Sequence, residues 1–263
     1  MLNIVIPMAG RGSRFQKEGF TLPKPLIPVR GVPMIHLVVD QLTPKQDHRF
    51  IFLCLEEHLE NYQVTNMLKK AAPGCLIVPV REVTEGAACT VLLAEKHIDN
   101  DDGLMIANSD QWVDLDINDY LQAMDDGQFQ GFIMTMKADD PKWSFIEYDS
   151  NKKVIGVVEK KVVSDDATVG IYNFAKGSDF VKHAKNMIQQ NLRVNGEFYV
   201  APVYTELVRH SGSIGIHNVG SEYNGMHGLG IPSDLAKFEE TNVAQRAVAH
   251  LDHFDYTNHS ESV

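Results

Sequence analysis

The chain has 263 residues, of which 44% are hydrophobic and 22% are charged, so its composition is globular and excludes disordered and collagen-like classes. It carries 24 Lys and Arg residues against 35 Asp and Glu residues, a formal net charge of −11. Such an acidic chain lacks the basic field that nucleic acid or an anionic membrane requires, although a local basic pocket for a small phosphate ligand is compatible with it.

Strands and helices alternate in the first half of the chain. Short apolar runs predict strands over 2–7, 50–55, 75–80 and 103–107. Apolar residues at helical spacing predict helices over 34–42, 57–72 and 87–97. This alternation predicts an α/β fold with a mostly parallel sheet and helices on both faces.

Short strands with turns between them dominate the second half. They are expected over 131–137, 145–149, 154–159, 168–174 and 215–219, with a hairpin-like turn at 149–151. Helices are expected over 179–190, 197–210 and 233–251, with Ser233 as the N-cap of the last one. The tail from Asp252 is polar and is expected to fray.

The cysteines and the first residues indicate a cytoplasmic protein. Cys54, Cys75 and Cys89 lack C-x-x-C spacing, which is typical of reduced thiols in a cytosol. No apolar run approaches the ~18 residues of a membrane span. The first seven residues lack a charged n-region, so they are expected to form a strand rather than a signal peptide.

The strongest functional signal is the loop that follows the first predicted strand. Its glycines, Gly10 and Gly12, would let the backbone approach phosphates closely. The loop lacks the G-K-[ST] ending of a P-loop and the third glycine of a dinucleotide fingerprint. Its neighbourhood is nevertheless rich in cations, at Arg11, Arg14, Lys17 and Lys24. This excess in an acidic chain favours phosphate binding over an ordinary turn with solvated cations.

Two further motifs support a phosphate site. Pro23 and Pro25 fix the backbone on both sides of Lys24 and hold it as a stiff phosphate clamp, unless the segment is only a rigid surface turn. Asp110 follows a predicted strand at the same sheet edge as the glycine loop. A carboxylate there can hold Mg²⁺ against a triphosphate, although a lone Asp after a strand is more often a turn residue.

Together these residues resemble the sugar-phosphate nucleotidylyltransferases (NDP-sugar pyrophosphorylases) of the nucleotidyltransferase family. The family pattern has a G-x-G-x-R loop, a nearby P-K-P, a strand-end Asp and a later E-K pair. The corresponding residues here are Gly10-Arg11-Gly12-Ser13-Arg14, Pro23-Lys24-Pro25, Asp110 and Glu159-Lys160. Four separate motifs in the family order argue against chance agreement.

The resemblance implies a Rossmann-like, three-layer α/β fold with a mostly parallel mixed sheet, of the nucleotide-diphospho-sugar transferase type. One domain would cover residues 1–240, with a nucleotide-binding half over about 1–125 and a sugar-phosphate half over about 126–240. Residues 241–263 would form the end of a C-terminal helix and a polar tail. The reaction would transfer NMP from an NTP to a sugar 1-phosphate or similar phosphomonoester, for surface polysaccharide precursors.

The resemblance also assigns roles to residues. Arg14 and Lys24 would contact the triphosphate and the reacting phosphates, and Asp110 would bind Mg²⁺. On the acceptor side, Lys160 would bind the sugar phosphate and Glu159 the sugar hydroxyls. The other substrate-binding residues would be Trp143, Gly170 and Glu197. The nucleotide would be bound by Met8, Ala9, Gly10, Arg11, Gly12, Ser13, Gly86 and Ala87.

The sequence departs from the family at two places. Gly228 stands where many members have a second metal-binding Asp, so the metal would depend on Asp110, phosphates and water or on another ligand. Arg81 lies near the place of the base-reading Gln of some members. The nucleobase, the acceptor and the second metal ligand therefore stay open, and a homo-oligomer is neither required nor excluded.

Two other interpretations are compatible with the sequence. One is a glycosyltransferase of the related GT-A-like fold, for which Asp114-Leu115-Asp116 would be the D-x-D metal motif. Arg14 and Lys24 argue against it, because a nucleotide sugar needs less triphosphate clamping. The other is a catalytically silent, sugar-nucleotide-binding regulatory subunit. Only a nucleotidylyltransferase releases pyrophosphate from a triphosphate and a sugar phosphate.

Overall fold

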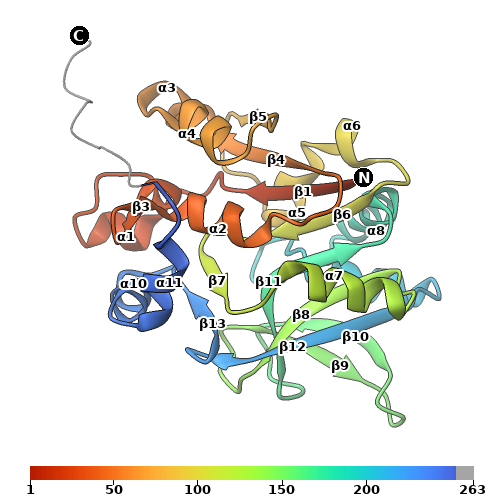
Figure 1. Ribbon diagram of the computed structural model, residues 1–263. Coiled ribbons are helices and arrows are strands. Elements are labelled where there is room, and N and C mark those ends of the chain that lie inside the picture. The colour runs from red at the N-terminus through yellow and green to blue at the C-terminus, as the bar shows by residue number, and fades with distance from the viewer. Residues whose placement is uncertain (253–263) are drawn as a thin grey trace.

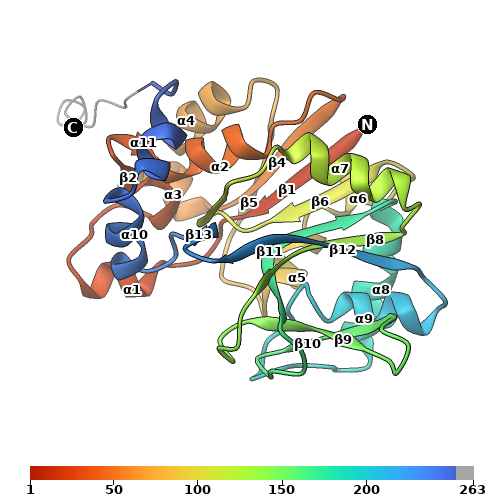
Figure 2. The same ribbon diagram turned by 60° about the horizontal axis from the view of Figure 1, so that its bottom comes forward.

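The computed structural model describes residues 1–252, and its centre is one mixed sheet of 11 strands. The main path of this sheet runs β5-β4-β1-β6-β11-β8-β12-β13-β7, and β9 and β10 branch from β11. Helices lie on both faces (Figures 1 and 2). The predicted three-layer α/β fold with a mixed sheet is confirmed.

The first half of the chain supplies the parallel part of the sheet. Its strands are β1 (Leu2–Pro7), β4 (His48–Leu55), β5 (Leu76–Val80) and β6 (Gly103–Ala107). They pair in parallel, with β1 between β4 and β6. The helices here are α1 (Ser13–Lys17), η1 (Lys24–Leu26), α2 (Met34–Leu42), α3 (Glu56–Asn61), α4 (Val64–Ala71), α5 (Ala87–Leu92) and α6 (Glu95–Ile98). A small separate sheet joins β2 (Pro28–Val29) to β3 (Val32–Pro33).

The second half extends the same sheet with antiparallel and parallel pairs. Its strands are β7 (Gln111–Val113), β8 (Gly131–Lys137), β9 (Ser144–Tyr148), β10 (Val154–Glu159), β11 (Asp166–Phe174), β12 (Ile214–Glu222) and β13 (Gly225–Gly228). Its helices are α7 (Ile117–Asp126), α8 (Gly177–Gln189), α9 (Val203–Arg209), α10 (Pro232–Glu239) and α11 (Asn242–Val248). Strand β11 runs antiparallel to β6 and so joins the two halves of the sheet.

The alternation of side chains along β1 produces two apolar cores. Ile4 and Ile6 are buried with residues of α2, α4 and α7 on one face of the sheet. Val5 is buried with residues of α5, α8 and α9 on the other face. A strand that is apolar on both sides in this way is typical of a parallel sheet covered by helices.

The C-terminal helices pack against the N-terminal segment. Ala244, Ala247 and Val248 of α11 and Phe238 of α10 share a buried cluster with Phe15 of α1. Figure 2 shows α10 and α11 beside α1 and α2, far in sequence but adjacent in space. This contact holds the end of the described chain close to the glycine-containing loop.

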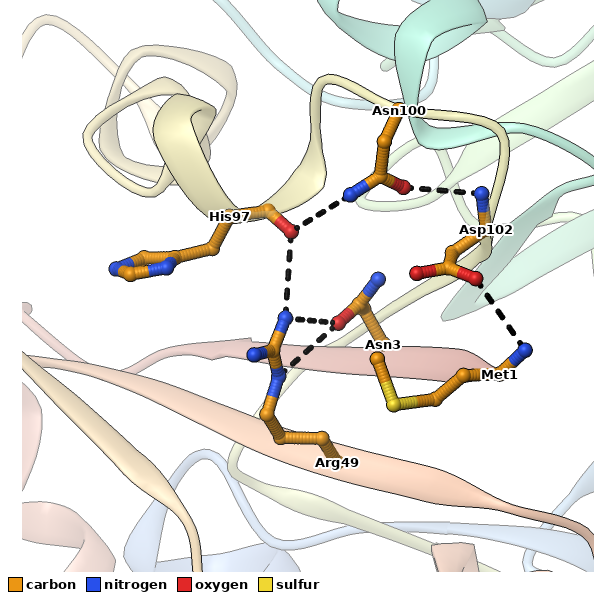
Figure 3. A network of polar contacts seen from close by, with 6 residues as sticks. All are labelled: Met1, Asn3, Arg49, His97, Asn100 and Asp102. Carbon is orange, nitrogen blue, oxygen red and sulfur yellow. Dashed lines mark hydrogen bonds and ion pairs between the residues drawn. The ribbon is translucent and has the colours of Figure 1, made fainter.

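A polar network closes the amino-terminal edge of the parallel strands (Figure 3). The guanidinium of Arg49 donates to the Asn3 side-chain oxygen, at 2.7 Å through Nη2, and to the backbone oxygen of His97. The N-terminal ammonium lies 3.3 Å from Asp102. Because the strands are parallel, this network lies at the edge opposite to the one that carries the candidate site.

Several predicted helices are wrong in extent. The segment 57–72 forms two helices, α3 and α4, because Tyr62 is extended between them. The segment 87–97 is likewise divided into α5 and α6. The segment 233–251 is divided into α10 and α11, where Thr241 caps α11 with its side chain.

Two further expectations about helix starts fail. The helix expected over 197–210 begins only at Val203, because the residues before it are bonded to the segment around Gly86. Ser233 is not an N-cap, since α10 begins at Pro232, a residue that suits the first position of a helix. The tail from residue 253, for which fraying is expected, lies outside the described residues.

Candidate functional site

The candidate site lies at the carboxyl ends of β1 and β6. These strands are parallel neighbours, so the loop after Pro7 and the segment after Ala107 emerge at one edge of the sheet. Ligands of open α/β sheets bind at this edge. The structure therefore brings the glycine loop and Asp110 to the same side, as the sequence predicts.

Lys24 and Asp110 are in direct contact. The Lys24 ammonium lies 2.7 Å from Oδ2 of Asp110, and each side chain is about a quarter exposed, at 24% and 23%. Gly12 supports this arrangement, because it adopts a left-handed conformation and a Cβ there would lie 3.2 Å from the Lys24 Cβ. The P-K-P segment and the glycine loop thus pack on each other and aim one cation at the strand-end carboxylate.

The segment after β13 also packs against Asp110. Its backbone oxygen accepts a hydrogen bond from the Leu229 amide at 2.8 Å. A Cβ on Gly230 would lie 2.6 Å from Oδ2 of Asp110, so this position leaves no room for a side chain unless the carboxylate moves. Gly228 pairs with Gln111 across the β13–β7 ladder. Hence the segment that lacks the second family Asp lies directly beside the first.

The donors near Asp110 are compatible with Mg²⁺ in one particular way. Among residues 1–252, no group of three or more His, Cys, Asp or Glu side chains has the arrangement of a metal site. Mg²⁺ is commonly held by one or two carboxylates, with water and substrate phosphates as its other ligands. Asp110 supplies one such carboxylate, so a metal here would depend on phosphate oxygens from the nucleotide.

The other loop residues fall into two groups. Met8 and Ala9 have buried side chains, in the cores on opposite faces of the sheet, so only their backbones can face a ligand. Arg11, Ser13 and Arg14 are exposed. The side chain of Arg14 forms no hydrogen bond or ion pair within residues 1–252, so its contact with phosphates stays a prediction.

The two segments predicted for the base and for the acceptor are bound to each other. Gly86 has a φ of 138°, and a Cβ on it would lie 2.4 Å from the Phe198 carbonyl oxygen. The Phe198 amide donates to the Glu85 oxygen at 2.8 Å, and the Ala88 amide donates to the Phe198 oxygen at 3.0 Å. Ala87, at the start of α5, is half-buried beside this junction. The segments predicted to bind the nucleotide and the acceptor are therefore in direct contact.

Glu159 is the last residue of β10, and Lys160, which follows it, has a different environment. Glu159 is half-buried, accepts a hydrogen bond from the Ser144 hydroxyl, and has its pKa raised above the usual value by burial. Lys160 has a left-handed φ of 55° and is exposed, with its ammonium 2.6 Å from the Tyr199 hydroxyl. That hydrogen bond raises the pKa of Lys160, so the side chain is cationic at neutral pH.

Two other predicted acceptor-side residues, Trp143 and Glu197, lie near this pair. The backbone oxygen of Trp143 accepts a hydrogen bond from the Lys160 amide at 3.0 Å. The indole nitrogen of Trp143 is buried without a hydrogen-bond partner in the described chain. Glu197 is exposed and acts electrostatically on both Glu159 and Lys160. The structure therefore brings together the predicted residues of the acceptor side.

Gly170 connects the acceptor side to the strand-end segment. Its φ is 82°, and a Cβ on it would lie 2.1 Å from the Asn108 amide nitrogen and 2.6 Å from the Gln111 side-chain oxygen. The backbone amide of Asn108 donates a hydrogen bond to the backbone oxygen of Gly170 at 3.0 Å. This glycine permits β11 to approach the residues that flank Asp110.

Three contacts at the site are absent from the sequence-based prediction. They are the hydroxyl of Ser144 on Glu159, the hydroxyl of Tyr199 on Lys160, and the packing of Gly230 on Asp110. Ser144 and Tyr199 lie within segments that carry predicted residues, so proximity to Trp143 and Glu197 was the available signal. Gly230 had no comparable signal, because its role depends on how β13 pairs with β7.

Comparison with known proteins identifies similar sequences and folds. A family model described as nucleotidyl transferase matches residues 4–198. A bifunctional protein GlmU of Methanococcus vannielii is 25% identical over 245 residues, which cover 89% of this chain and 53% of that protein. The chain spans about half the length of the curated relatives it matches.

Two solved structures illustrate the likeness of fold. A nucleoside-diphosphate-sugar pyrophosphorylase from Vibrio cholerae RC9 has a TM-score of 0.74 and 23% identity, over 90% of this chain and 100% of that one. The inositol-1-phosphate CTP transferase from T. maritima has a TM-score of 0.72 and 14% identity, over 95% of this chain and 97% of that one. At these identities the likeness concerns the arrangement of strands and helices.

Proposed function

This chain belongs to the nucleotidyl transferase family, and from that premise we propose that it transfers a nucleoside monophosphate from a nucleoside triphosphate to a sugar 1-phosphate or a related phosphomonoester. Pyrophosphate is the second product. The observation that carries the proposal is the contact between Lys24 and Asp110, 2.7 Å apart at the ligand-binding edge of the sheet. A cation that can bind phosphate and a carboxylate that can bind a metal ion, side by side at this edge, suit a triphosphate substrate.

Electrostatic repulsion is the main obstacle to this reaction, because the acceptor phosphate and the triphosphate are both anions. Arg14 and Lys24 supply positive charge from the nucleotide side, and Lys160 supplies it from the acceptor side. A bound Mg²⁺, held by Asp110, would neutralise further charge on the triphosphate. The attacking phosphate oxygen is already a nucleophile, so the reaction needs no general base from the protein.

The acceptor side supports a phosphomonoester with hydroxyl groups. Lys160 is cationic and Glu159 offers carboxylate oxygens beside it, with Tyr199 and Glu197 close by. A phosphate would bind the ammonium, and hydroxyls would donate to the carboxylate. The wall shared by Gly86 and Phe198 would place the nucleotide next to this acceptor.

The proposed setting is the cytoplasm, in the supply of precursors for surface polysaccharide. Cys54, Cys75 and Cys89 are free thiols, which suits a reducing compartment. Within residues 1–252, no helix has both the length and the apolar character needed to cross a membrane. Neither nucleic acid nor membrane is proposed as a partner, and a homo-oligomer stays open.

A pyrophosphate-release screen tests the proposal. Four nucleoside triphosphates are combined with a panel of sugar 1-phosphates and other phosphomonoesters, with and without Mg²⁺. We expect release from at least one pair, dependent on both substrates and on the metal. Transfer from a nucleotide sugar without pyrophosphate would indicate a glycosyltransferase, and binding of a sugar nucleotide without turnover would indicate a regulatory subunit; either result overturns the proposal.

A further inference from the structure

The carboxylate of Asp110 has two candidate partners. Oδ2 of Asp110 accepts the Lys24 ammonium at 2.7 Å, and the same carboxylate is the one that would hold a divalent cation. A divalent cation on this carboxylate would lie close to the Lys24 ammonium, and the like charges would repel each other. Binding of a metal would therefore weaken the contact seen here.

We propose that Lys24 and the divalent cation compete for Asp110, so that Lys24 leaves the carboxylate for the nucleotide phosphates only when the metal arrives. This inference depends on the metal site of the proposed function. It predicts that the free protein binds the metal weakly and that the metal enters with the triphosphate. Metal and nucleotide then bind cooperatively through an exchange of partners at one carboxylate.

The surroundings hold both residues in place for this exchange. Pro23 and Pro25 fix the backbone beside Lys24, while its side chain stays partly exposed. The backbone oxygen of Asp110 accepts a hydrogen bond from the Leu229 amide, and Gly230 packs closely against the carboxylate. A short movement of the ammonium is therefore easier than a movement of the carboxylate.

Charge balance gives the exchange its direction. Lys24 neutralises Asp110 in the free protein, so a divalent cation that binds alone leaves an ammonium without a partner next to a new positive charge. The triphosphate removes this penalty, because its oxygens accept the displaced ammonium in a charge-assisted hydrogen bond. The lysine thereby couples the two ligands without any movement of the backbone.

Binding of Mn²⁺ to the nucleotide-free protein tests the proposal directly. The titration is followed by the electron paramagnetic resonance signal of free Mn²⁺, so the readout does not depend on turnover. Lys24→Gln should bind Mn²⁺ at least about fivefold more tightly than the wild type, because it removes a partly exposed ion pair. Asp110→Asn should abolish the gain when combined with Lys24→Gln.

Lys17→Gln is the matched control. Lys17 lies at the end of α1 and is exposed. Its substitution by Gln removes one positive charge, as Lys24→Gln does. It should alter Mn²⁺ affinity by less than about twofold, since the charge of an exposed lysine that does not contact Asp110 is screened. Circular dichroism checks that both variants are folded. If both then change Mn²⁺ affinity equally, the change comes from the lost charge alone and the proposal is overturned.

A second titration includes a non-hydrolysable triphosphate analogue. In the wild type the phosphates then accept the lysine, so the advantage of Lys24→Gln should disappear or reverse. An advantage that is unchanged by the analogue overturns the exchange. If the exchange holds while no substrate pair releases pyrophosphate, the proposed function alone is wrong, so the two failures are distinguishable.

Discussion

Gly86 lies directly against the backbone of Phe198, with the position of its missing Cβ only 2.4 Å from the Phe198 carbonyl oxygen. Two segments more than a hundred residues apart are joined there by hydrogen bonds from the Phe198 and Ala88 amides. The two segments that are proposed to bind the nucleotide and the acceptor are therefore positioned by the same contact. Only glycine combines this approach with a φ of 138°.

Gly86→Ala should destabilise the protein and displace both segments. The added methyl group meets backbone atoms that cannot turn away, and the backbone conformation is strained for alanine, so we expect a loss of about 2–4 kcal/mol. Urea unfolding measures the loss. Gly10→Ala is the control, because a Cβ on Gly10 has no atom within 4 Å and should change stability little. Equal losses in both variants would contradict the role assigned to Gly86.

Lys24→Ala and Arg14→Ala should each lower the rate of pyrophosphate release by several powers of ten. One preorganised contact with developing charge is worth about 3–4 kcal/mol. The fold should persist, since the Lys24–Asp110 ion pair is partly exposed and Arg14 is exposed. Lys69→Ala, on the exposed end of α4, is the control for charge. Near-normal turnover of folded Lys24→Ala protein would disprove the assignment.

Tyr199→Phe should weaken binding of the acceptor more than it slows turnover. The hydroxyl that accepts the Lys160 ammonium at 2.6 Å is lost, so the lysine is no longer held toward the acceptor. We expect the KM for the phosphomonoester to rise about fivefold, with the KM for the triphosphate unchanged. Tyr62→Phe removes a hydroxyl bonded to Thr21 and is the control. A change confined to kcat would argue against a positioning role.

The sequence predicts the site best where a residue type has a chemical reason to follow a strand. Lys24, Asp110 and Gly12 meet because the carboxyl ends of β1 and β6 share one edge, which follows from their parallel pairing. Glu159 and Lys160 are adjacent in sequence and needed no folding to meet. The contact of Gly230 with Asp110 depends instead on the pairing of β13 with β7, two short strands that carry little apolar signal.

The fold is predictable to a similar extent and for similar reasons. The strands β1, β6, β8 and β10 have their predicted limits, because each is an apolar run between turn residues. Helix ends are less predictable. The segment before Val203 is not helical, because Phe198 is bonded to Glu85 and Ala88, and such a tertiary bond leaves no trace in local propensity.

Glu159 should make stability depend on pH in a specific direction. Burial raises the pKa of this carboxyl above its usual value of 4.5. Above that pH the unfolded chain loses the proton while the folded protein keeps it, so the folded state binds more protons and stability falls as pH rises, until the folded carboxyl ionises. Urea unfolding from about pH 4 to about pH 8 measures this slope.

Glu159→Gln is the matching variant, because an amide keeps the size of the side chain and cannot ionise. Its stability relative to the wild type should rise across the same pH window. Ser144 still donates or accepts at the amide, so the local packing is preserved. A difference between variant and wild type that is independent of pH would mean that Glu159 ionises normally in the folded protein.

Asp114 and Asp116 decide between a nucleotidylyltransferase and a D-x-D glycosyltransferase. Asp114 pairs with Arg246 at 2.8 Å, and Asp116 accepts the Asn118 amide as the N-cap of α7, so both carboxylates have structural partners. The double variant Asp114→Asn, Asp116→Ala should therefore lower the midpoint of thermal unfolding and leave pyrophosphate release close to normal. Asp110→Asn should do the opposite, with loss of release and little change in the midpoint. If pyrophosphate release is lost in the folded double variant but retained in Asp110→Asn, the metal site must be assigned to the D-x-D pair instead.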